Sequence, residues 1–237
     1  YYPNGKLYKE TTLKNGVEHG IYKQYYEDGS LNYLGKKEYG KLTDTLKVFY
    51  KNGRLQRLCV YENGQLDGDY LGFHPNGRIM IQCTYQKDEI TGDYYEYYSD
   101  GDIKEIGQYD EKGQKTGLWK TFYHDSLLHA SGHYSNNKYN GNWKIYYKSG
   151  VLKQTGKYKN GNALGFWKFF YPNGKIKEHG HYLNDQKQGP WFSYTKEGLL
   201  ENIAHYRNHT PDGPFWKNED GKWIKSLVVE GEPLNHN

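Results

Sequence analysis

The sequence predicts an all-β protein, built as one elongated array of antiparallel β-hairpin repeats of about 24 residues that forms an open, extended sheet. Three observations predict this fold. A turn-forming glycine recurs every 24 residues, aromatic residues stand at fixed distances before it, and bulky residues are matched by small ones across each expected turn. A fixed period along the whole chain is typical of repeat proteins, in which each unit contacts only its neighbours.

The recurring turn residue, called the turn mark below, sets the register. The marks are Gly5, Gly29, Gly53, Gly77, Gly101, Ser126, Gly150, Gly174, Gly198 and Gly221. Asn-Gly and Asp-Gly tolerate positive φ at both central positions, so we expect a two-residue type I′ turn at each mark. A second glycine precedes each new hairpin, and Asp44 replaces it once. Both series contain one step of 25, which places a one-residue insertion in the loop around residues 111–113.

A two-residue turn pairs the residue seven before the mark with the residue six after it. In every such pair a large side chain lies opposite a small one: each Trp faces Gly or Ala, and the two cysteines face a Leu and a Tyr. This volume compensation favours the register and predicts an indole lying over bare backbone. The predicted pairs are Tyr22/Gly35, Leu46/Cys59, Tyr70/Cys83, Tyr94/Gly107, Trp119/Gly132, Trp143/Gly156, Trp167/Gly180 and Trp191/Ala204.

Side chains on a strand alternate between its two faces. We therefore expect one face, the core, to carry the Trp column, the Tyr three before the mark, the Leu or Ile two after it and the small residue. The opposite face combines an aromatic residue four before each mark with lysines two positions earlier. This aromatic–basic face is the candidate partner-binding surface: Tyr25, Phe49, Phe73, Tyr97, Phe122, Tyr146, Phe170 and Tyr194, with Lys120, Lys144 and Lys168.

The chain divides, on this interpretation, into residues 1–213, an array of about nine repeats with a truncated first one, and residues 214–237, a degenerate last repeat and C-terminal cap. The first residue is not Met, and it falls near the end of a hairpin's first strand. We therefore expect that residues preceding Tyr1 were removed by processing or trimming.

Composition excludes several classes of protein. The net charge of +4 and pI near 8.7 are too weak to indicate a nucleic-acid ligand. No run of 18 apolar residues is present to span a bilayer. A mean hydropathy of −1.08 with 25% charged residues approaches the disordered class, but 27 Tyr, 8 Phe and 6 Trp at regular spacing contradict disorder.

Motifs for catalysis or cofactor binding are also absent, so we expect no catalytic residues, no cofactor and no enzyme activity. His133, His181 and His205 share a column, but equivalent positions in neighbouring repeats lie about 10 Å apart, too far to share a metal ion. His179 and His181 face the same way without a third ligand in register. Cys59 and Cys83 lie one repeat apart, beyond disulfide range, and are expected to fill the core.

The pattern Gly-x-Trp-x-x-Tyr-Tyr-x-Asn-Gly-x-Leu, ending in Tyr-x-Asn-Gly-x-x-x-Gly, resembles the MORN repeat variants of bacteria, including YwqK-type antitoxins. Residues 119–141, 143–165 and 167–189 match it closely, whereas residues 36–43 and the last repeat depart from it. The resemblance implies an antiparallel β-array, a role in protein binding or scaffolding and, from the antitoxin label, a toxin as partner. Related arrays have been linked to membrane surfaces and to dimers.

Three functions remain open. The first is binding of a partner protein through the aromatic–basic face, since interfaces favour aromatic anchors. The second is binding of a polyanion, a saccharide or a membrane surface through aromatic rings interleaved with Lys. The third is a self-associating structural spacer. A processed N-terminus favours the bacterial cell envelope as location, with the cytoplasm as the alternative.

Overall fold

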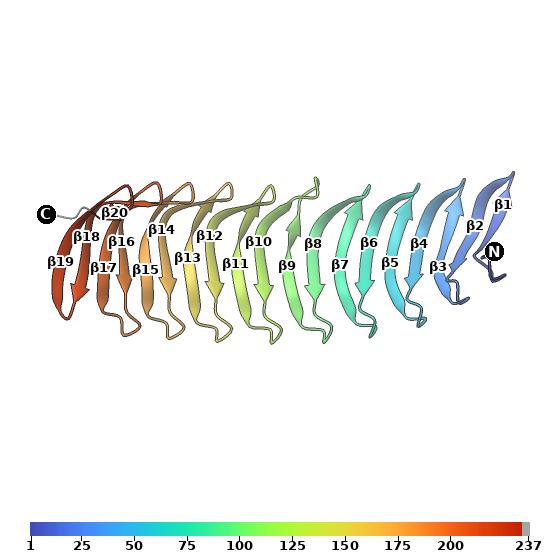
Figure 1. Ribbon diagram of the computed structural model, residues 1–237. Helices are drawn as coiled ribbons and strands as arrows, with labels where there is room; N and C mark the ends of the chain where they lie inside the picture. The colour runs from blue at the N-terminus through green and yellow to red at the C-terminus, as the bar shows by residue number, and fades with distance from the viewer. Residues whose placement is uncertain (234–237) are drawn as a thin grey trace. The chain divides into compact units, whose positions relative to one another are not determined.

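The computed structural model describes residues 1–233 of the 237-residue chain, so residues 234–237 of the expected cap lie outside the described residues. The contacts divide the chain into two compact units. Within each unit the strands follow one another in chain order (Figure 1). The first unit comprises Tyr1–Thr116 and His124–Ser126, and the second comprises Gly117–Tyr123 and Leu127–Asn237. Each unit is described by itself.

All regular structure in residues 1–233 is β-strand, which confirms the predicted fold class. In each unit the strands pair antiparallel with their neighbours in the chain and leave the sheet open. The first unit contains β1 Lys9–Lys14, β2 Val17–Tyr25, β3 Leu31–Glu38, β4 Lys41–Phe49, β5 Leu55–Glu62, β6 Gln65–Phe73, β7 Ile79–Gln86, β8 Glu89–Tyr97 and β9 Ile103–Tyr109. The second contains most of β10 Lys115–Phe122, then β11 Leu128–Ser135, β12 Lys138–Tyr146, β13 Leu152–Lys159, β14 Asn162–Phe170, β15 Ile176–Leu183, β16 Gln186–Tyr194, β17 Leu200–Arg207, β18 Thr210–Glu219, β19 Lys222–Val229 and β20 Glu232–Pro233.

The strand register confirms every predicted pair of bulky and small residues. The first unit pairs Tyr22 with Gly35, Leu46 with Cys59, Tyr70 with Cys83 and Tyr94 with Gly107. The second pairs Trp119 with Gly132, Trp143 with Gly156, Trp167 with Gly180 and Trp191 with Ala204. Side-chain volume therefore predicts the hairpin register correctly.

The predicted type I′ turn is present at the mark Gly221, where Asp220 and Gly221 have φ of 49° and 83° and Glu219 pairs with Lys222. At the marks from Gly5 to Gly198 the predicted turn type is wrong. In the second hairpin the Tyr26 N–H donates to the Ser30 carbonyl at 2.8 Å, and the Gly29 N–H donates to the Tyr26 carbonyl at 2.8 Å. Gly29 has φ of 91°, whereas Asp28 does not have positive φ. The Asp28 carboxylate instead accepts the Ser30 N–H at 2.8 Å. This is a three-residue loop with a left-handed Gly, not a type I′ turn.

The register survives this error because each hairpin from β2–β3 to β16–β17 also carries a one-residue bulge, whereas β18–β19 has the two-residue turn and no bulge. Tyr25 pairs with Leu31 and Gln24 pairs with Tyr33, so Asn32 is the extra residue. A three-residue loop shifts the pairing of the two strands by one residue, and the bulge shifts it back by one residue. Beyond the bulge the strands therefore pair as they would after a two-residue turn. The bulge also corrects the predicted faces, because Leu31 pairs with Tyr25 and directly paired residues share a face. The Leu/Ile column thus belongs to the aromatic–basic face and not to the core.

Two-residue type I′ turns occur at the opposite ends of the strands. Asn15 and Gly16 have φ of 53° and 78°, and Asn63 and Gly64 repeat this geometry with 52° and 88°. The exception is the loop at residues 110–114, where the Asp110 N–H donates to the Gln114 carbonyl at 2.9 Å. That three-residue loop confirms the predicted one-residue insertion.

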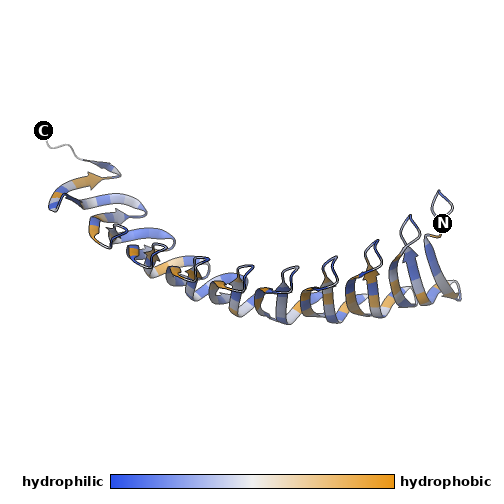
Figure 2. Cartoon of the chain, turned by 90° about the horizontal axis from the view of Figure 1, so that it is seen from below, coloured by the Kyte–Doolittle hydropathy of each residue, from blue (hydrophilic) through white to orange (hydrophobic). Residues whose placement is uncertain are grey.

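The core lies on one face of each sheet. In the second unit it is made of indoles, since Trp119, Trp143, Trp167 and Trp191 are 1–7% exposed. Neighbouring tyrosines pack edge-on against these rings; for example, the Tyr158 and Trp167 centroids lie 4.9 Å apart at 80°. In the first unit smaller residues replace the indoles, and Leu46, Val48 and Cys59 form the buried cluster. Figure 2 shows hydrophobic stretches in orange and hydrophilic stretches in blue on the same strands, and a one-sided core requires both.

The indoles of Trp143, Trp167 and Trp191 each occupy the space beside the glycine of the preceding strand. A Cβ atom added to Gly132 would lie 2.0 Å from Cδ2 of Trp143, and one added to Gly156 would lie 2.0 Å from Cδ2 of Trp167. Both glycines also pair in register with an indole-bearing residue of the preceding strand. The indole therefore links one hairpin to the next, so the predicted pairs are right in register but the prediction that the indole lies over the glycine of its own hairpin is wrong.

Candidate partner-binding face

The predicted aromatic residues occupy one equivalent place in the fold. Each is the last residue of the first strand of a hairpin, from Tyr25 at the end of β2 to Tyr194 at the end of β16. All eight are half-buried, as are Lys120 and Lys168, while Lys144 is exposed. Because one repeat supplies two strands, equivalent rings of successive repeats lie about 10 Å apart. Within each unit the rings therefore form a regular row.

The Lys column and the aromatic column share a face, as predicted. Lys23 and Tyr25 both reach Glu10 on the neighbouring strand, with the Lys23 Nζ 3.2 Å and the Tyr25 hydroxyl 3.0 Å from Oε2. These hydrogen bonds, from Lys23 first and then Tyr25, lower the pKa of the Glu10 carboxyl. Burial, followed by the contact with Glu10, raises the pKa of Tyr25.

The charge of this face changes along the first unit. The Lys column begins with Lys23 and Lys47, but Leu71 and Tyr95 occupy the equivalent positions in the next two repeats. Asp69 and Asp93 lie beside them and line a shallow hollow of about 380 Å³. The aromatic–basic face of the first unit is therefore basic at one end and acidic in its middle.

In the second unit three strands bring together what we call the His179 cluster: Phe166 and Lys168 of β14, His179 and His181 of β15, and Phe192 and Tyr194 of β16. The His179 ring stacks on Phe192 with centroids 4.9 Å apart at 27°, and Phe166 lies 5.3 Å away on the other side. The Lys168 Nζ lies 5.6 Å from the Phe166 ring centroid. Phe166 remains 44% exposed, so the cluster offers an aromatic surface to solvent.

The His179 imidazole is held in one orientation by a polar contact. Its Nε2 lies 3.0 Å from the Tyr194 hydroxyl, whereas Nδ1 is buried without a hydrogen-bond partner among residues 1–233. Burial, then the positive charge of Lys168 and the proximity of His181, lower the pKa of His179. The ring is therefore neutral near pH 7 and behaves as an aromatic platform.

Sequence reasoning placed Tyr194 and Lys168 on this face but missed Phe166, His179 and Phe192 as surface residues. Phe166 lies eight residues before its turn mark. Other repeats have Asp, Thr, Leu or Asn at this position, so the repeat pattern does not predict an aromatic residue there. For His179 the sequence indicates a solvated strand histidine in preference to a metal ligand, and neither interpretation predicts a packed ring. The usable signal was the local density of rings in β14–β16, not a repeated position.

A row of tyrosine hydroxyls joins neighbouring repeats beside the face. The Tyr three before the mark donates its O–H to the backbone carbonyl of the aromatic residue 23 positions later. Tyr26 reaches the Phe49 carbonyl at 2.7 Å, and Tyr147 reaches the Phe170 carbonyl at 2.7 Å. The same bond is made by Tyr2, Tyr50, Tyr123 and Tyr171, and by Nε2 of His74. The row fixes the backbone from which the candidate rings project.

Other chemistry is not evident in the described part of the chain. Residues 1–233 contain no group of three or more His, Cys, Asp or Glu side chains placed to hold a metal ion. Cys59 and Cys83 are free and buried, and burial raises the pKa of the Cys83 thiol to about 11. The same residues include no helix of the length and hydrophobicity needed to cross a bilayer.

The fold and this face define a single-layer β-hairpin repeat protein with an aromatic-rich surface. The MORN repeat variant family matches residues 1–15, 18–35, 66–87, 90–111, 139–160 and 165–184, just over half of the chain. The chain therefore belongs to the MORN repeat variant family. None of the curated proteins matches it significantly.

Solved structures give only distant similarity. The structure titled "Crystal Structure of TcdB2-TccC3-TEV" has 12% identity, a TM-score of 0.23, and alignment over 98% of this chain but 14% of that chain. The structure titled "Crystal Structure of TcdB2-TccC3" has 11% identity and a TM-score of 0.23, over 90% of this chain and 15% of that one. The chain thus spans about a seventh of these proteins, and scores this low support no argument about function.

Proposed function

We propose that this MORN repeat protein is a non-enzymatic scaffold that binds a partner protein through its aromatic–basic face. We further propose that it acts in a bacterium as an antitoxin-like protein, with a toxin as its partner. The second proposal depends on the resemblance of the repeat pattern to YwqK-type antitoxins, and the first depends on the surface itself.

The observation that carries the proposal is the His179 cluster. Protein interfaces are enriched in aromatic residues whose rings are rigid and partly exposed, and the largest contributions come from clustered anchors. Phe166, His179 and Phe192 form such a group, and the stacking at 4.9 Å and 5.3 Å fixes the rings before a partner arrives. A preformed surface loses less conformational entropy on binding.

Site-specific cross-linking tests this proposal. A photoreactive phenylalanine analogue replaces Phe166 in one sample and Leu199, a 68% exposed residue in a turn, in the control. After irradiation in an extract of the source cells, we expect one dominant protein adduct from position 166 and none of that mass from position 199. Unlabelled protein added before irradiation competes with the labelled protein for the partner. The double variant Lys168→Glu, Phe192→Ala should reduce the adduct at least about tenfold less effectively than the unlabelled wild type. Identical adducts from both positions would contradict the proposal.

The polyanion, saccharide or membrane alternative receives less support from the charges. A polyanion needs a continuous basic track, whereas Asp69 and Asp93 interrupt the face in the first unit. In the second unit the lysines of the column, Lys120, Lys144 and Lys168, would have to bind the polyanion without the first unit. Retention on heparin or on anionic vesicles at low salt, lost in the variant Lys144→Glu, Lys168→Glu, would favour this alternative over a protein partner.

A further inference from the structure

A hollow opens on the opposite, core face of the first unit. It has a volume of about 590 Å³, within the range of sites that hold small ligands, roughly 300–1,000 Å³. Its walls include Lys37, Lys41, Arg57, Leu42, Leu46 and Tyr61, and we call it the Arg57 hollow. Since it does not touch the aromatic–basic face, the inference below is independent of the proposed function.

The hollow exists because two repeat columns are broken there. Leu46 stands in the column that holds Tyr or Trp in the other hairpins from β2–β3 to β16–β17, and Lys37 stands where most repeats have Tyr. Removing two large rings from a one-sided core leaves space that the neighbouring side chains do not fill. Residues 36–65, which supply most of the walls, also fall in a gap between the segments that match the MORN repeat variant family.

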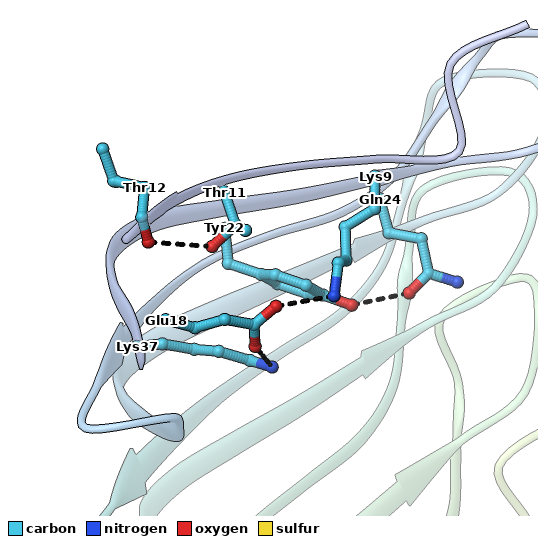
Figure 3. A network of polar contacts seen from close by, with 7 residues as sticks. All are labelled: Lys9, Thr11, Thr12, Glu18, Tyr22, Gln24 and Lys37. Atoms are coloured by element: carbon cyan, nitrogen blue, oxygen red, sulfur yellow. Dashed lines mark hydrogen bonds and ion pairs between the residues drawn. The ribbon is translucent and has the colours of Figure 1, made fainter. Parts of the chain in front are cut away.

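The lining is positively charged. Lys37, Lys41 and Arg57 face the hollow, and the lining contains no Asp or Glu. Lys37 forms an ion pair with Glu18, its Nζ lying 2.6 Å from Oε2 (Figure 3). The other oxygen, Oε1, lies 2.6 Å from Lys9 Nζ, so the two lysines share one carboxylate. The hydrogen bonds from Lys37 and then Lys9 lower the pKa of the Glu18 carboxyl. Lys41 and Arg57 form no ion pair within residues 1–233, so their charges are not compensated.

Arg57 also has a donor without an acceptor. Its Nε is buried and makes no hydrogen bond among the described residues. A buried donor left unpaired destabilises a protein, and an incoming acceptor removes that cost. The planar guanidinium matches a carboxylate with two parallel hydrogen bonds. The apolar walls of Leu42 and Leu46 and the ring of Tyr61 suit a hydrocarbon stem better than a strongly hydrated phosphate.

We propose that the Arg57 hollow binds a carboxylate carried on a short aliphatic stem. Arg57 and Lys41 would bind the carboxylate oxygens, while Leu42, Leu46 and Tyr61 would contact the stem. Two sources share this chemistry: a glutamate side chain in a peptide and a free small dicarboxylic acid.

Nuclear magnetic resonance of ¹⁵N-labelled arginine tests the proposal directly. The chain contains four arginines, Arg54, Arg57, Arg78 and Arg207, so their Nε–H signals can be resolved and assigned by substitution. The probes are glutarate, the peptide acetyl-Ala-Glu-Ala-amide and inorganic phosphate. We expect a saturable shift of the Arg57 signal alone with glutarate or with the peptide, and the tighter of the two identifies the source. No saturable shift with either carboxylate, parallel shifts of all four arginines, or an equal saturable shift with phosphate would overturn the proposal.

Variants provide the matched comparison, with affinity for glutarate and for the peptide measured by calorimetry. Arg57→Gln should weaken binding about tenfold or more, because it removes charge-assisted hydrogen bonds. Arg54→Gln, which changes an arginine in the adjacent turn, should bind as the wild type does. Leu46→Trp restores the aromatic column and fills the hollow, so it should keep the β circular dichroism spectrum and abolish binding even if Arg57→Gln does not fold. Wild-type affinity in Leu46→Trp would refute the proposal.

Discussion

At the scale of single residues, close contact between an indole and a glycine decides how tightly hairpins pack. Gly156 has no side chain, and the Trp167 ring occupies the space that a Cβ atom would need, at 2.0 Å from Cδ2. Trp167 is 3% exposed and cannot move outward without losing its buried contacts. An extra methyl group at this position must therefore displace a large ring or separate the strands.

Gly156→Ala should lower the free energy of unfolding by about 2–3 kcal/mol, the usual cost of overpacking. Urea denaturation followed by tryptophan fluorescence measures the change. The control is Gly72→Ala, where the nearest atom to an added Cβ would be the flexible Met80 Cε at 3.4 Å. We expect the control to cost less than about 1 kcal/mol. Equal losses in the two variants would show that the indole contact has no special role.

The buried imidazole of His179 makes stability depend on pH. Its pKa lies below the ordinary value of 6.5, chiefly because burial disfavours the charged form. Between that ordinary value and the lower folded value, the unfolded chain binds a proton that the folded chain does not. The contribution of His179 to folding is therefore complete at pH 7 and is lost as pH falls below about 6.5.

His179→Phe keeps a stacked ring but cannot titrate, so its unfolding free energy should fall less than that of the wild type between pH 7 and pH 5. Chemical denaturation at several pH values measures both slopes. His124→Gln, which changes an exposed histidine paired with Asp100, serves as the control and should retain the slope contributed by His179. Parallel wild-type and His179→Phe curves would argue against a depressed pKa.

At the scale of elements, neighbouring hairpins are joined by side chains that bridge one repeat to the next. Each tyrosine of the row beside the face donates to a carbonyl 23 residues away, so the hydrogen bond links turn to strand end between hairpins. Tyr147→Phe removes only the O–H that reaches the Phe170 carbonyl at 2.7 Å. The loss leaves a half-buried acceptor without its partner and should cost about 1 kcal/mol.

Thermal or urea unfolding of Tyr147→Phe checks this cost against Tyr39→Phe. The Tyr39 ring is 76% exposed in a turn, so removing its hydroxyl should change stability by less than about 0.5 kcal/mol. If Tyr147→Phe is as stable as Tyr39→Phe, the row of hydroxyls does not contribute to stability, and the indoles alone join the hairpins.

The strands and their register could be predicted from sequence because both depend on side-chain volume and period, which repeat along the chain. The turn type could not, since Asn-Gly is compatible both with type I′ and with a three-residue loop ending in a left-handed Gly. The two turns differ in length by one residue, and the extra residue of the bulge, such as Asn32, restores the same strand pairing. The choice of face for the Leu/Ile column failed for the same reason.

The candidate site was predictable only in part. The aromatic row and its lysines follow from periodicity, and contacts such as those of Lys23 and Tyr25 with Glu10 confirm that they share a face. The His179 cluster and the Arg57 hollow arise where individual residues depart from the repeat pattern. A prediction that uses only residue types shared by several repeats does not detect such residues. Departures from the repeat are therefore where further function should be sought.

At the scale of the whole molecule, a chain whose repeats contact only their neighbours should tolerate loss of one complete period. Repeat proteins have stabilities close to a sum over units and their interfaces. Deleting residues 151–174 joins Gly150 to Lys175 and brings the strand of Trp143 opposite that of Gly180, the same type of pair as Trp143 with Gly156.

The domain assignment we propose, an array in residues 1–213 and a cap in residues 214–237, is unchanged by this deletion, although β18 runs across the boundary between them.

The 24-residue deletion should give a soluble protein with the β circular dichroism spectrum and a lower urea midpoint, because one interface is lost. A matched deletion of residues 151–162 removes half a period, which joins strands of the wrong direction and breaks the pairing of indole with glycine. We expect that variant to aggregate or to lose its near-ultraviolet signal from packed aromatic rings. If both deletions fold equally well, the period does not determine the packing; if neither folds, cooperativity extends beyond neighbouring repeats.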